Sequence, residues 1–376
     1  MAKYKGKSQR RMKGWHQRVV AGGEADDTTD SRRLGFGRRE VKLPPARLDA
    51  PEQNLDELPK TEGMVTGFYP GGILVRTADG PLLCMVAKTF RSLEGTSALT
   101  VGDNVTVAIV PRTAAEASTK ADKDRADGMI IAREKRTSVL ARPAPRSAKR
   151  NDPYAEEAFE KVLAANIDLL VLVVATKKPA LRRGLVDRFL IIADRGGLAP
   201  VLVVNKIDLG QPDLEVLADL EHLELPMAFC SAESGEGLDD LREILTGNRS
   251  VLAGASGVGK TSLINAIIPG AQGLTREIRA KDNRGRHTTT AAVLYDLPGG
   301  GLIIDTPGIR ELSLPLTAQD LPWYFPEFEQ IAPQCKFNDC THTHEPGCAV
   351  QKAVEEGQIP AGRYESYIRM LETIER

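Results

Sequence analysis

The chain contains 376 residues, of which 41% are hydrophobic and 27% are charged, a composition typical of soluble proteins with two or three domains. Its formal net charge is −1, and its longest apolar stretches, such as 169–175, are far shorter than the roughly 20 residues of a membrane-spanning helix, which excludes such a helix. No segment of signal-peptide type follows the basic N-terminus, so we expect a cytoplasmic protein without a membrane partner.

Residues 1–60 are polar, charged and interrupted by Pro and Gly, with no sustained hydrophobic period of 2 or 3.6, so we expect a disordered extension. Its first twenty positions hold seven lysines and arginines and no acidic residue. Such a segment suits binding to phosphate groups, although it could equally serve only as a solubilising end.

Residues 61–136 change to short β-rich runs separated by Gly, Asp and Pro, which predicts a small five-stranded barrel. The expected strands are 63–69, 73–77, 82–86, 105–110 and 129–134. An OB-fold, which commonly binds oligonucleotides, is the natural candidate, but the number of strands does not exclude an SH3-like barrel or a structural spacer.

Residues 137–152 are basic and contain Pro, which indicates a linker, and from 153 to 315 apolar strands alternate with helical patterns. This alternation predicts a multidomain α/β protein whose second domain is a doubly wound parallel sheet. The expected strands are 167–175, 200–204, 227–230, 251–253, 292–295 and 301–305, and the expected helices are 185–194, 214–223 and 238–245.

The segment 254–262, GASGVGKTS, lies between an apolar strand and a helical pattern and fits the phosphate-binding P-loop. Gly254 and Gly259 allow the backbone amides to face the phosphates, Lys260 reaches the β and γ oxygens, and the Thr261 hydroxyl is placed to bind Mg²⁺. The predicted phosphate-binding residues are Gly254, Ala255, Ser256, Gly257, Val258, Gly259, Lys260, Thr261 and Ser262.

The sequence Asn205-Lys206-Ile207-Asp208 follows a predicted strand, at the edge of an open α/β sheet where ligands bind. The Asp208 carboxylate can accept from two guanine donors that adenine lacks, Asn205 can reach the other edge of the base, and the Lys206 stem can lie along it. Ser231 and Ala232 follow the next strand and complete a site for GTP and GDP.

A further GTPase segment, Asp305-Thr306-Pro307-Gly308, ends the strand that follows the P-loop unit. We expect Asp305 to reach Mg²⁺ through water and the Gly308 amide to meet the γ-phosphate, with Thr289 of the run 288–290 as a further Mg²⁺ ligand. The guanine-binding segments precede the P-loop, the reverse of the usual order, so we predict a circularly permuted GTPase domain.

Three of the five cysteines crowd together in Cys335-x4-Cys340-x-His342-x5-Cys348, a spacing that suits a tetrahedral Cys₃His structural zinc site. His344 is a competing imidazole that spacing does not exclude, and a metal-free cluster is the alternative. The site would belong to a small, mainly helical domain over residues 316–376. Its last helix carries an apolar face that predicts packing, consisting of Tyr364, Tyr367, Ile368, Leu371 and Ile374.

From residue 61 to the end, the chain resembles the RsgA family of circularly permuted small-ribosomal-subunit biogenesis GTPases. The resemblance rests on GASGVGKTSL, NKID, the Cys/His cluster, GRHTTT at 285–290 and DTPGIRE at 305–311. It implies an OB domain, a permuted GTPase domain, a zinc domain with His342 as ligand, and a late step in maturation of the 30S subunit on 16S rRNA. We further expect a monomer that hydrolyses GTP with Mg²⁺ and does not bind DNA.

The position after Gly308 is Ile309, where many GTPases carry a glutamine that orients the attacking water. His287 is the candidate for this role, because a neutral imidazole can accept a hydrogen bond from water and the family pattern GRHTTT points to the same position. We expect His287, Thr289 and Lys260 to form the catalytic set. Arg284 or Arg286 could instead stabilise charge, and His287 could contact only RNA or solvent.

These features predict an assembly factor whose GTPase activity the 30S subunit stimulates. A GTPase that acts on another ribosomal or RNA substrate is the first alternative. An RNA-binding module with vestigial nucleotide binding is the second.

Overall fold

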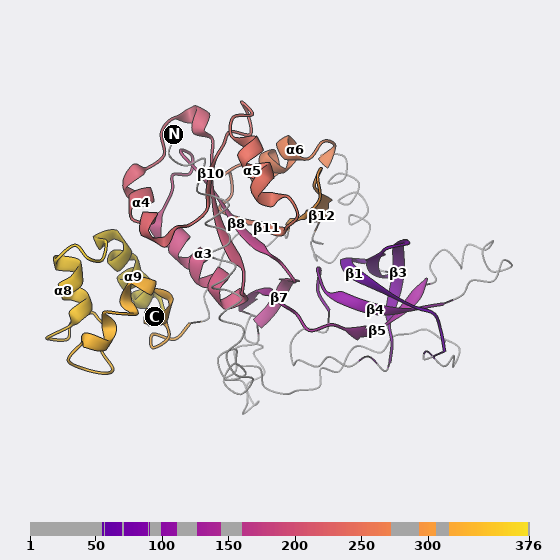
Figure 1. Cartoon of the computed structure of the whole chain (residues 1–376), viewed down its shortest axis with the longest axis horizontal. Coiled ribbons are helices and arrows are strands. Elements are labelled where there is room, and N and C mark those ends of the chain that lie inside the picture. The colour runs from indigo at the N-terminus through magenta and orange to yellow at the C-terminus, as the bar shows by residue number, and fades with distance from the viewer. Residues whose placement is uncertain are drawn as a thin grey trace.

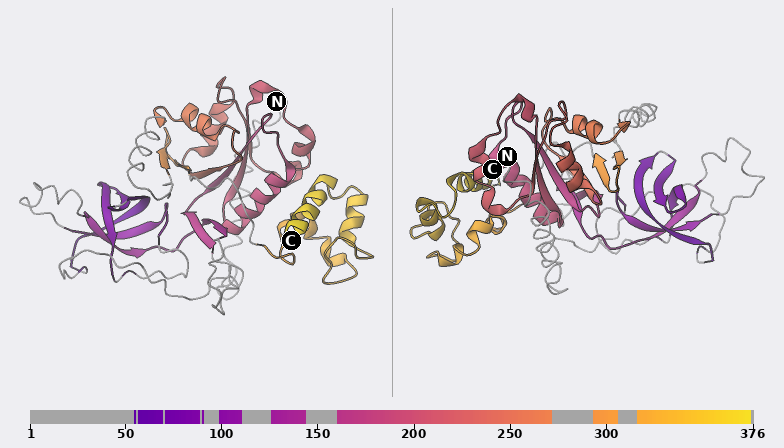
Figure 2. Two further views of the ribbon diagram at one scale, coloured as in Figure 1. Left: turned by 180° about the vertical axis from the view of Figure 1, so that it is seen from behind. Right: turned by 45° about the horizontal axis from the view of Figure 1, so that its top comes forward.

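The computed structural model describes residues 55, 57–69, 71–88, 90, 99–110, 126–143, 160–271, 293–305 and 316–374. These residues form an N-terminal barrel, a central α/β domain and a C-terminal module, with the barrel and the module on opposite sides of the central sheet (Figures 1 and 2). The expected extension up to residue 54, most of the expected linker, and the segments that contain His287, Thr289 and Gly308 lie outside the described residues.

The barrel has five strands in the closed order β1-β2-β3-β5-β4, which confirms the predicted small OB-like barrel. All neighbouring strands are antiparallel except β3 and β5, and the interior is filled by apolar side chains such as Val65, Val75 and Ile130. The strands are β1 (Lys60–Tyr69), β2 (Gly72–Thr77), β3 (Gly80–Val86), β4 (Asn104–Ile109) and β5 (Gly128–Arg133).

The central sheet has the order β10-β9-β8-β11-β13-β12, in which only the edge strand β12 runs antiparallel. Every residue of β8 and β9 is buried, as expected of strands covered on both faces. The strands are β8 (Leu169–Ala175), β9 (Ala199–Asn205), β10 (Met227–Phe229), β11 (Arg249–Ala253), β12 (Val293–Asp296) and β13 (Leu302–Asp305).

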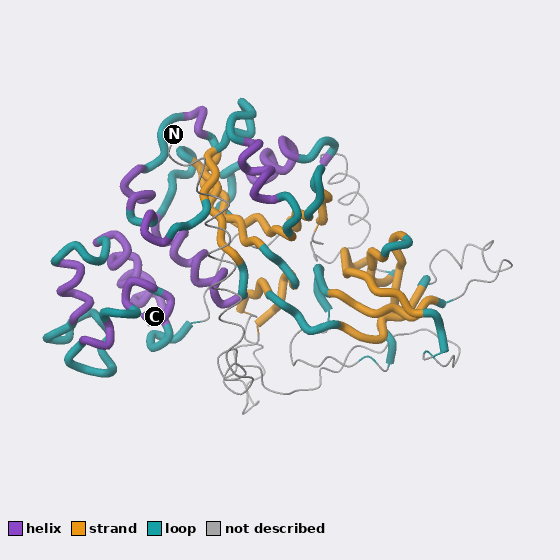
Figure 3. The backbone as a smooth tube through the Cα atoms, viewed as in Figure 1, coloured by secondary structure: helices purple, strands orange, loops and turns teal. Residues whose placement is uncertain are grey.

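Helices lie on both faces of this sheet (Figure 3), and an apolar cluster lies on each face, which confirms the doubly wound architecture. One cluster includes α5 (Leu238–Leu245) and α6 (Lys260–Ile267), and the other includes α3 (Arg183–Gly196) and α4 (Leu214–Ala218). The continuous helix expected over 214–223 was wrong. The α-helix ends at Ala218 and a 3-10 turn follows at Glu221–Leu223, an arrangement in which both Leu220 and Leu223 are buried in the core.

A two-stranded antiparallel sheet that the sequence pattern does not predict lies between the barrel and the central sheet (Figure 1). Its strands are β6 (Val139–Pro143), inside the expected linker, and β7 (Glu160–Ala165). Val101 of the barrel region forms a parallel bridge with Ala164 of β7, and both side chains are buried in the central core. The barrel is therefore joined to the central domain by packed structure.

The C-terminal module comprises residues 316–374, with α8 (Ala349–Glu355) and α9 (Ala361–Ile374) as its α-helices. The apolar face predicted for the last helix packs in the module core, where Tyr367 and Leu371 are buried and Tyr364, Ile368 and Ile374 lie against them. Ile191 of α3 belongs to the same core, so the module packs directly on the central domain. Among the described residues, no helix is long and apolar enough to cross a membrane.

Candidate functional site

The P-loop begins where the central strand β11 ends and leads directly into α6, whose N-cap is Gly259. Gly254, Gly257 and Gly259 have φ values of 141°, 83° and 97°, in a region that L side chains rarely adopt. A Cβ on Gly254 would also lie 2.2 Å from the carbonyl oxygen of Val173. Glycine is therefore required here, and the loop places backbone N–H groups at a helix N-terminus, where phosphate binds well.

The Lys260 ammonium lies inside the loop, because its Nζ donates to the carbonyl oxygens of Gly254 at 2.6 Å and Ala255 at 3.0 Å. Thr261 and Ser262 follow in the first turn of α6 and are exposed. A flexible cation that lies among the P-loop carbonyls is placed to turn toward phosphate oxygens. An exposed hydroxyl in the next position is placed to bind a cation.

The Asn205-Lys206-Ile207-Asp208 segment contacts the P-loop directly. Lys206 adopts the left-handed conformation, with φ of 62°, and the Thr176 hydroxyl donates to its carbonyl oxygen at 2.6 Å. Its Nζ donates to the carbonyl oxygen of Gly257 at 2.6 Å and to that of Lys178 at 3.0 Å. The Lys206 side chain thus spans from the guanine segment to the phosphate loop, and Thr176 supports it, a role that no motif predicts.

Asn205 is only 1% exposed and joins three segments of the site. Its Nδ2 donates to the carbonyl oxygen of Val258 at 2.8 Å, and its Oδ1 accepts from the backbone N–H of Ala232 at 3.2 Å. A Cβ on Gly259 would lie 2.3 Å from Nδ2, so the P-loop glycine makes room for this amide. The Asn205 side chain therefore links the P-loop to the loop after β10. The sequence also predicts that it contacts the base.

Asp208 is exposed at the same edge, and the buried Ser231 fixes its orientation. The Ser231 hydroxyl donates to Asp208 Oδ1 at 2.5 Å and accepts from the backbone N–H groups of Glu233 and Ser234 at 3.2 and 3.1 Å. One carboxylate oxygen is thus held by the protein. The exposed carboxylate is available to accept hydrogen bonds from a ligand.

Asp305 ends β13, which pairs with the P-loop strand in the register Val251 with Ile304, so Asp305 lies at the same edge of the sheet. The structure therefore brings four predicted segments together at the carboxyl ends of β9, β10, β11 and β13. We call this region the nucleotide edge, consisting of 205–208, 231–232, 254–262 and Asp305. His287, Thr289 and Gly308 lie outside the described residues, so their roles remain predictions.

The ligand atoms of Cys335, Cys340, His342 and Cys348 all lie within 4.8 Å of one another, and we call these residues the Cys/His cluster. His342 Nδ1 is 3.6 Å from the sulfurs of Cys335 and Cys348, which are 4.0 Å apart. A tetrahedral Zn²⁺ with bonds of about 2.3 Å to sulfur and about 2.0 Å to nitrogen requires about 3.5 Å for these S–N separations and about 3.8 Å between sulfurs. The observed distances fit such an ion.

Surrounding groups orient the cluster and select His342. The backbone N–H groups of Ala349 and Gln351 donate to Cys335 Sγ at 3.3 Å and Cys348 Sγ at 3.4 Å, which favours thiolates. His342 adopts φ of 60°, and its carbonyl oxygen accepts from the Tyr364 hydroxyl at 2.7 Å. His344, the competing imidazole, is exposed and its Nδ1 lies 2.8 Å from the Thr343 hydroxyl instead.

The other two cysteines are buried in apolar cores and serve neither site. Burial raises the pKa of Cys230 to about 12, and burial together with the nearby Asp127 carboxylate raises the pKa of Cys84 to about 12. Both thiols therefore stay protonated at neutral pH and behave as small apolar side chains.

Comparison with known proteins identifies the family. Residues 133–315 match the family described as RsgA GTPase. A protein of Chlorobaculum parvum named Small ribosomal subunit biogenesis GTPase RsgA is 41% identical over 320 residues, which are 83% of this chain and 98% of that protein. A protein of the same name from Gemmatimonas aurantiaca is 41% identical over 315 residues, or 82% of this chain and 96% of that protein.

Two solved structures agree with the fold. The crystal structure of YjeQ from Thermotoga maritima has a TM-score of 0.61 and 32% sequence identity, and covers 84% of this chain and 98% of that one. YloQ, described as a circularly permuted GTPase, matches in fold with a TM-score of 0.60 at 24% identity, over 87% of this chain and 98% of that one. These likenesses and the order of the guanine and phosphate segments confirm the predicted permutation. The chain is therefore a GTP-hydrolysing enzyme that belongs to the RsgA GTPase family.

Proposed function

We propose that this GTPase is an assembly factor for the small ribosomal subunit, that it acts late in 30S maturation, and that the 30S particle stimulates its hydrolysis of GTP. The observation that carries the proposal is the nucleotide edge, where the P-loop and the oriented Asp208 carboxylate meet, in a chain that covers 98% of a relative named for small-subunit biogenesis. GTP hydrolysis suits an assembly factor, because loss of the γ-phosphate changes the conformation of a GTPase and can limit how long it stays bound to a particle.

GTP turnover with and without purified 30S subunits tests this proposal, with 50S subunits as the matched control. We expect strong stimulation by 30S and little by 50S. Equal stimulation by both particles would favour the alternative, a GTPase for another ribosomal substrate. GTP binding without turnover under any condition would favour an RNA-binding module with vestigial nucleotide binding.

Within the site, we propose that the charge of Lys260 and the P-loop amides stabilise the phosphate oxygens. We assign the selection of guanine to Asp208. Thr261, Asp305 and Thr289 would hold Mg²⁺, with Asp305 acting through water; Mg²⁺ neutralises charge on the β and γ oxygens when bound. The Thr261 hydroxyl and the Asp305 carboxylate are oxygen donors, which suit this hard cation. Their common edge of the sheet supports the assignment.

In the C-terminal module, we propose that the Cys/His cluster holds one structural Zn²⁺ per chain. Its four protein ligands leave no position for a substrate, and its separations match tetrahedral geometry. The ion would stabilise a module that contains few regular elements besides α8 and α9.

For catalysis, we propose that His287 positions the attacking water when the protein is bound to the 30S subunit. His287→Ala should bind GTP and 30S normally but lose most of the 30S-stimulated hydrolysis, on the order of 100-fold. Single-turnover hydrolysis on saturating 30S measures this effect, with Arg284→Ala and Arg286→Ala in parallel. If His287→Ala stays as fast as the parent, the water is positioned by another group.

For the ribosomal partner, we propose that the basic extension and the arginines at 279–286 contact phosphates of 16S rRNA. Affinity for 30S should then fall steeply with salt. Deletion of the extension should reduce the slope of log affinity against log salt by about 0.7 to 0.9 for each phosphate that the extension neutralises. An affinity that does not depend on salt would contradict this interaction with rRNA.

We expect the monomer to be the active form.

A further inference from the structure

The β12–β13 hairpin, residues 293–305, reaches from the nucleotide edge to the barrel. At one end Val293 pairs with Asp305, the residue assigned to the Mg²⁺ side of the nucleotide site, and at the other end Asp296 pairs with Leu302. Leu302 is level with Arg249, the first residue of the P-loop strand β11. The hairpin therefore extends along the strand direction from the barrel side of the sheet to the nucleotide edge. The ladder of paired residues couples its Asp296 end to its Asp305 end.

The Asp296 end of the hairpin is held by the barrel. Arg76 of β2 donates to both carboxylate oxygens of Asp296, at 2.5 and 3.1 Å, in the two-pronged geometry that arginine favours. Nearby, Arg249 donates to Asn104 of β4 at 3.4 Å. The barrel thus contacts the last residue of β12 and the first residue of β11, two strands whose opposite ends lie at the nucleotide edge.

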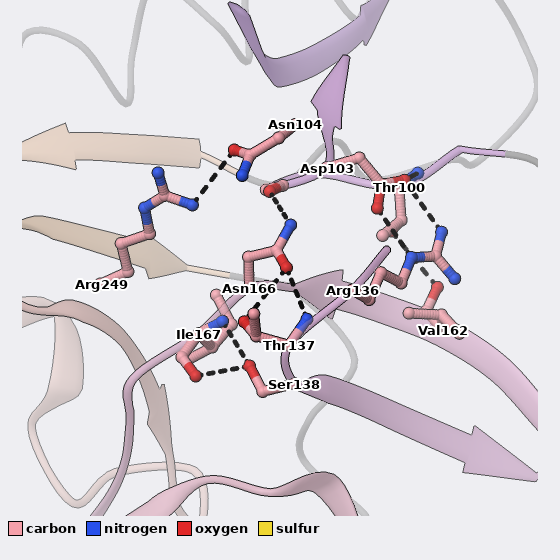
Figure 4. Close-up of polar contacts among 11 residues, drawn as sticks. Thr100, Asp103, Asn104, Arg136, Thr137, Ser138, Val162, Asn166, Ile167 and Arg249 are labelled. Carbon is pink, nitrogen blue, oxygen red and sulfur yellow. Dashed lines mark hydrogen bonds and ion pairs between the residues drawn. The ribbon is translucent and has the colours of Figure 1, made fainter. Parts of the chain in front are cut away.

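This contact differs from the rest of the joint between barrel and central domain. The main joint is buried: Asn166 Nδ2 donates to the carbonyl oxygen of Gly102 at 2.9 Å, and the neighbouring Arg136–Asp103 ion pair inside the barrel region has side chains only 2% and 0% exposed (Figure 4). At the hairpin, the side chains of Arg76 and Asp296 are 41% and 66% exposed and border a cavity of about 590 Å³. The Asp296 end of the hairpin is thus tethered to the barrel by an exposed pair beside open space, whereas Tyr295, Leu297 and Ile303 of the same hairpin are buried in the central core.

We propose that Arg76 and Asp296 are positioning residues for GTP hydrolysis. The buried joint fixes the barrel to β7 and β8, and the Arg76–Asp296 pair fixes the Asp296 end of the hairpin to the barrel. The pair therefore adds a second constraint on the position of Asp305, besides the pairing of β13 with the P-loop strand β11. A force on the barrel, such as binding to RNA, passes by this route to the nucleotide edge. The inference rests on the proposed function for its trigger, while the positioning role itself applies to hydrolysis with or without a ribosomal particle.

The test is a charge swap, with single-turnover GTP hydrolysis as the readout. Arg76→Asp and Asp296→Arg should each lower the rate roughly two- to fivefold, the range that an exposed ion pair supports, and the double variant R76D/D296R should recover it. Affinity for GDP and the melting temperature should stay at the parent values, because the pair is exposed and far from the guanine segments. Asp239→Arg, which breaks the exposed Arg242–Asp239 pair on α5, is the matched control and should change nothing.

Single variants that hydrolyse GTP as fast as the parent would overturn the inference, as would a swapped variant no faster than either single one. A fall in melting temperature that parallels the fall in rate would also overturn it, by showing a merely structural role. Rates are compared both with and without 30S. A parent that 30S fails to stimulate would contradict the proposed function alone, and the comparison of variants would still decide the positioning role.

Discussion

The Cys/His cluster and the nucleotide edge are both formed by polar residues, but these residues are close in the sequence in the cluster and far apart in the sequence at the nucleotide edge. The four cluster ligands come from fourteen consecutive positions and face one another, whereas the nucleotide edge takes its groups from the ends of four strands between residues 205 and 305 and leaves the Asp208 carboxylate exposed. One arrangement is closed and suits a permanently bound ion, and the other is open and suits a ligand that binds and dissociates. The first thus suits stability and the second suits turnover.

The largest effect should follow loss of the proposed zinc ion. His342→Ala removes a ligand and should release zinc and unfold the C-terminal module, because structural zinc contributes on the order of 10 kcal/mol of free energy that is coupled to folding. Elemental analysis and thermal unfolding measure the two consequences. His344→Ala, which alters an exposed imidazole two positions away, should keep both the zinc and the stability of the parent. Equal zinc content in the two variants would contradict the assigned ligand set.

The open site should show its largest effect at Asp208. Asp208→Asn replaces a charged acceptor of two guanine hydrogen bonds, each worth about 1.5 to 3 kcal/mol, so affinity for GTP should fall at least about 100-fold. The amide donor of the variant suits the C2 oxo group of xanthine, so xanthosine triphosphate should bind in preference to GTP. Competition binding with both nucleotides measures this preference, with the exposed Asp240→Asn as control. A variant that still prefers GTP would show that Asp208 does not read the base.

A buried network of charged side chains joins the C-terminal module to the central domain. Arg363 of α9 is buried and pairs with Asp187 of α3 and, at 2.5 Å, with Glu327 of the module. His222 also contacts Glu327, at 2.7 Å. Burial raises the pKa of Glu327, but the hydrogen bonds from His222 and Arg363 outweigh burial and bring this pKa to about 2. The ionised carboxylate therefore stabilises the fold at neutral pH.

This carboxylate predicts a specific dependence on pH. Because the pKa of Glu327 in the folded chain is depressed from 4.5, its contribution is present above that value and is lost as the pH falls toward 2. Glu327→Gln should cost about 3 kcal/mol of unfolding free energy at pH 7, and its difference from the parent should shrink below pH 4.5. Denaturant unfolding across this range measures the difference, with the exposed Glu329→Gln as control. A difference that does not vary with pH would show that the Glu327 charge does not stabilise the joint.

Patterns that lie within a short stretch of chain could be predicted from the sequence. The P-loop, the Cys/His cluster and the strand ends that carry Asn205 and Asp305 all follow from local spacing and hydrophobic period. The pairing of β6 with β7 could not be predicted, because a short strand in a basic segment finds its partner only when the barrel packs beside it. Arg363 likewise meets Asp187 across 176 positions, a contact that packing of α9 on α3 creates. Long-range partners of polar groups depend on packing and leave no periodic signal.

A smaller effect on GTP binding should follow from Ser231, which orients Asp208 and does not itself contact the base. Ser231→Ala removes the hydroxyl that donates to Asp208 at 2.5 Å and should weaken GTP binding roughly five- to tenfold, the value of one or two hydrogen bonds. Ser234→Ala, in the same loop but without contact to Asp208, is the control. Because Ser231 acts through Asp208, adding Ser231→Ala to Asp208→Asn should cost much less than it costs alone. Fully additive losses in this double-mutant cycle would mean that Ser231 shapes the loop after β10 by itself, and the orientation of Asp208 would then need another source.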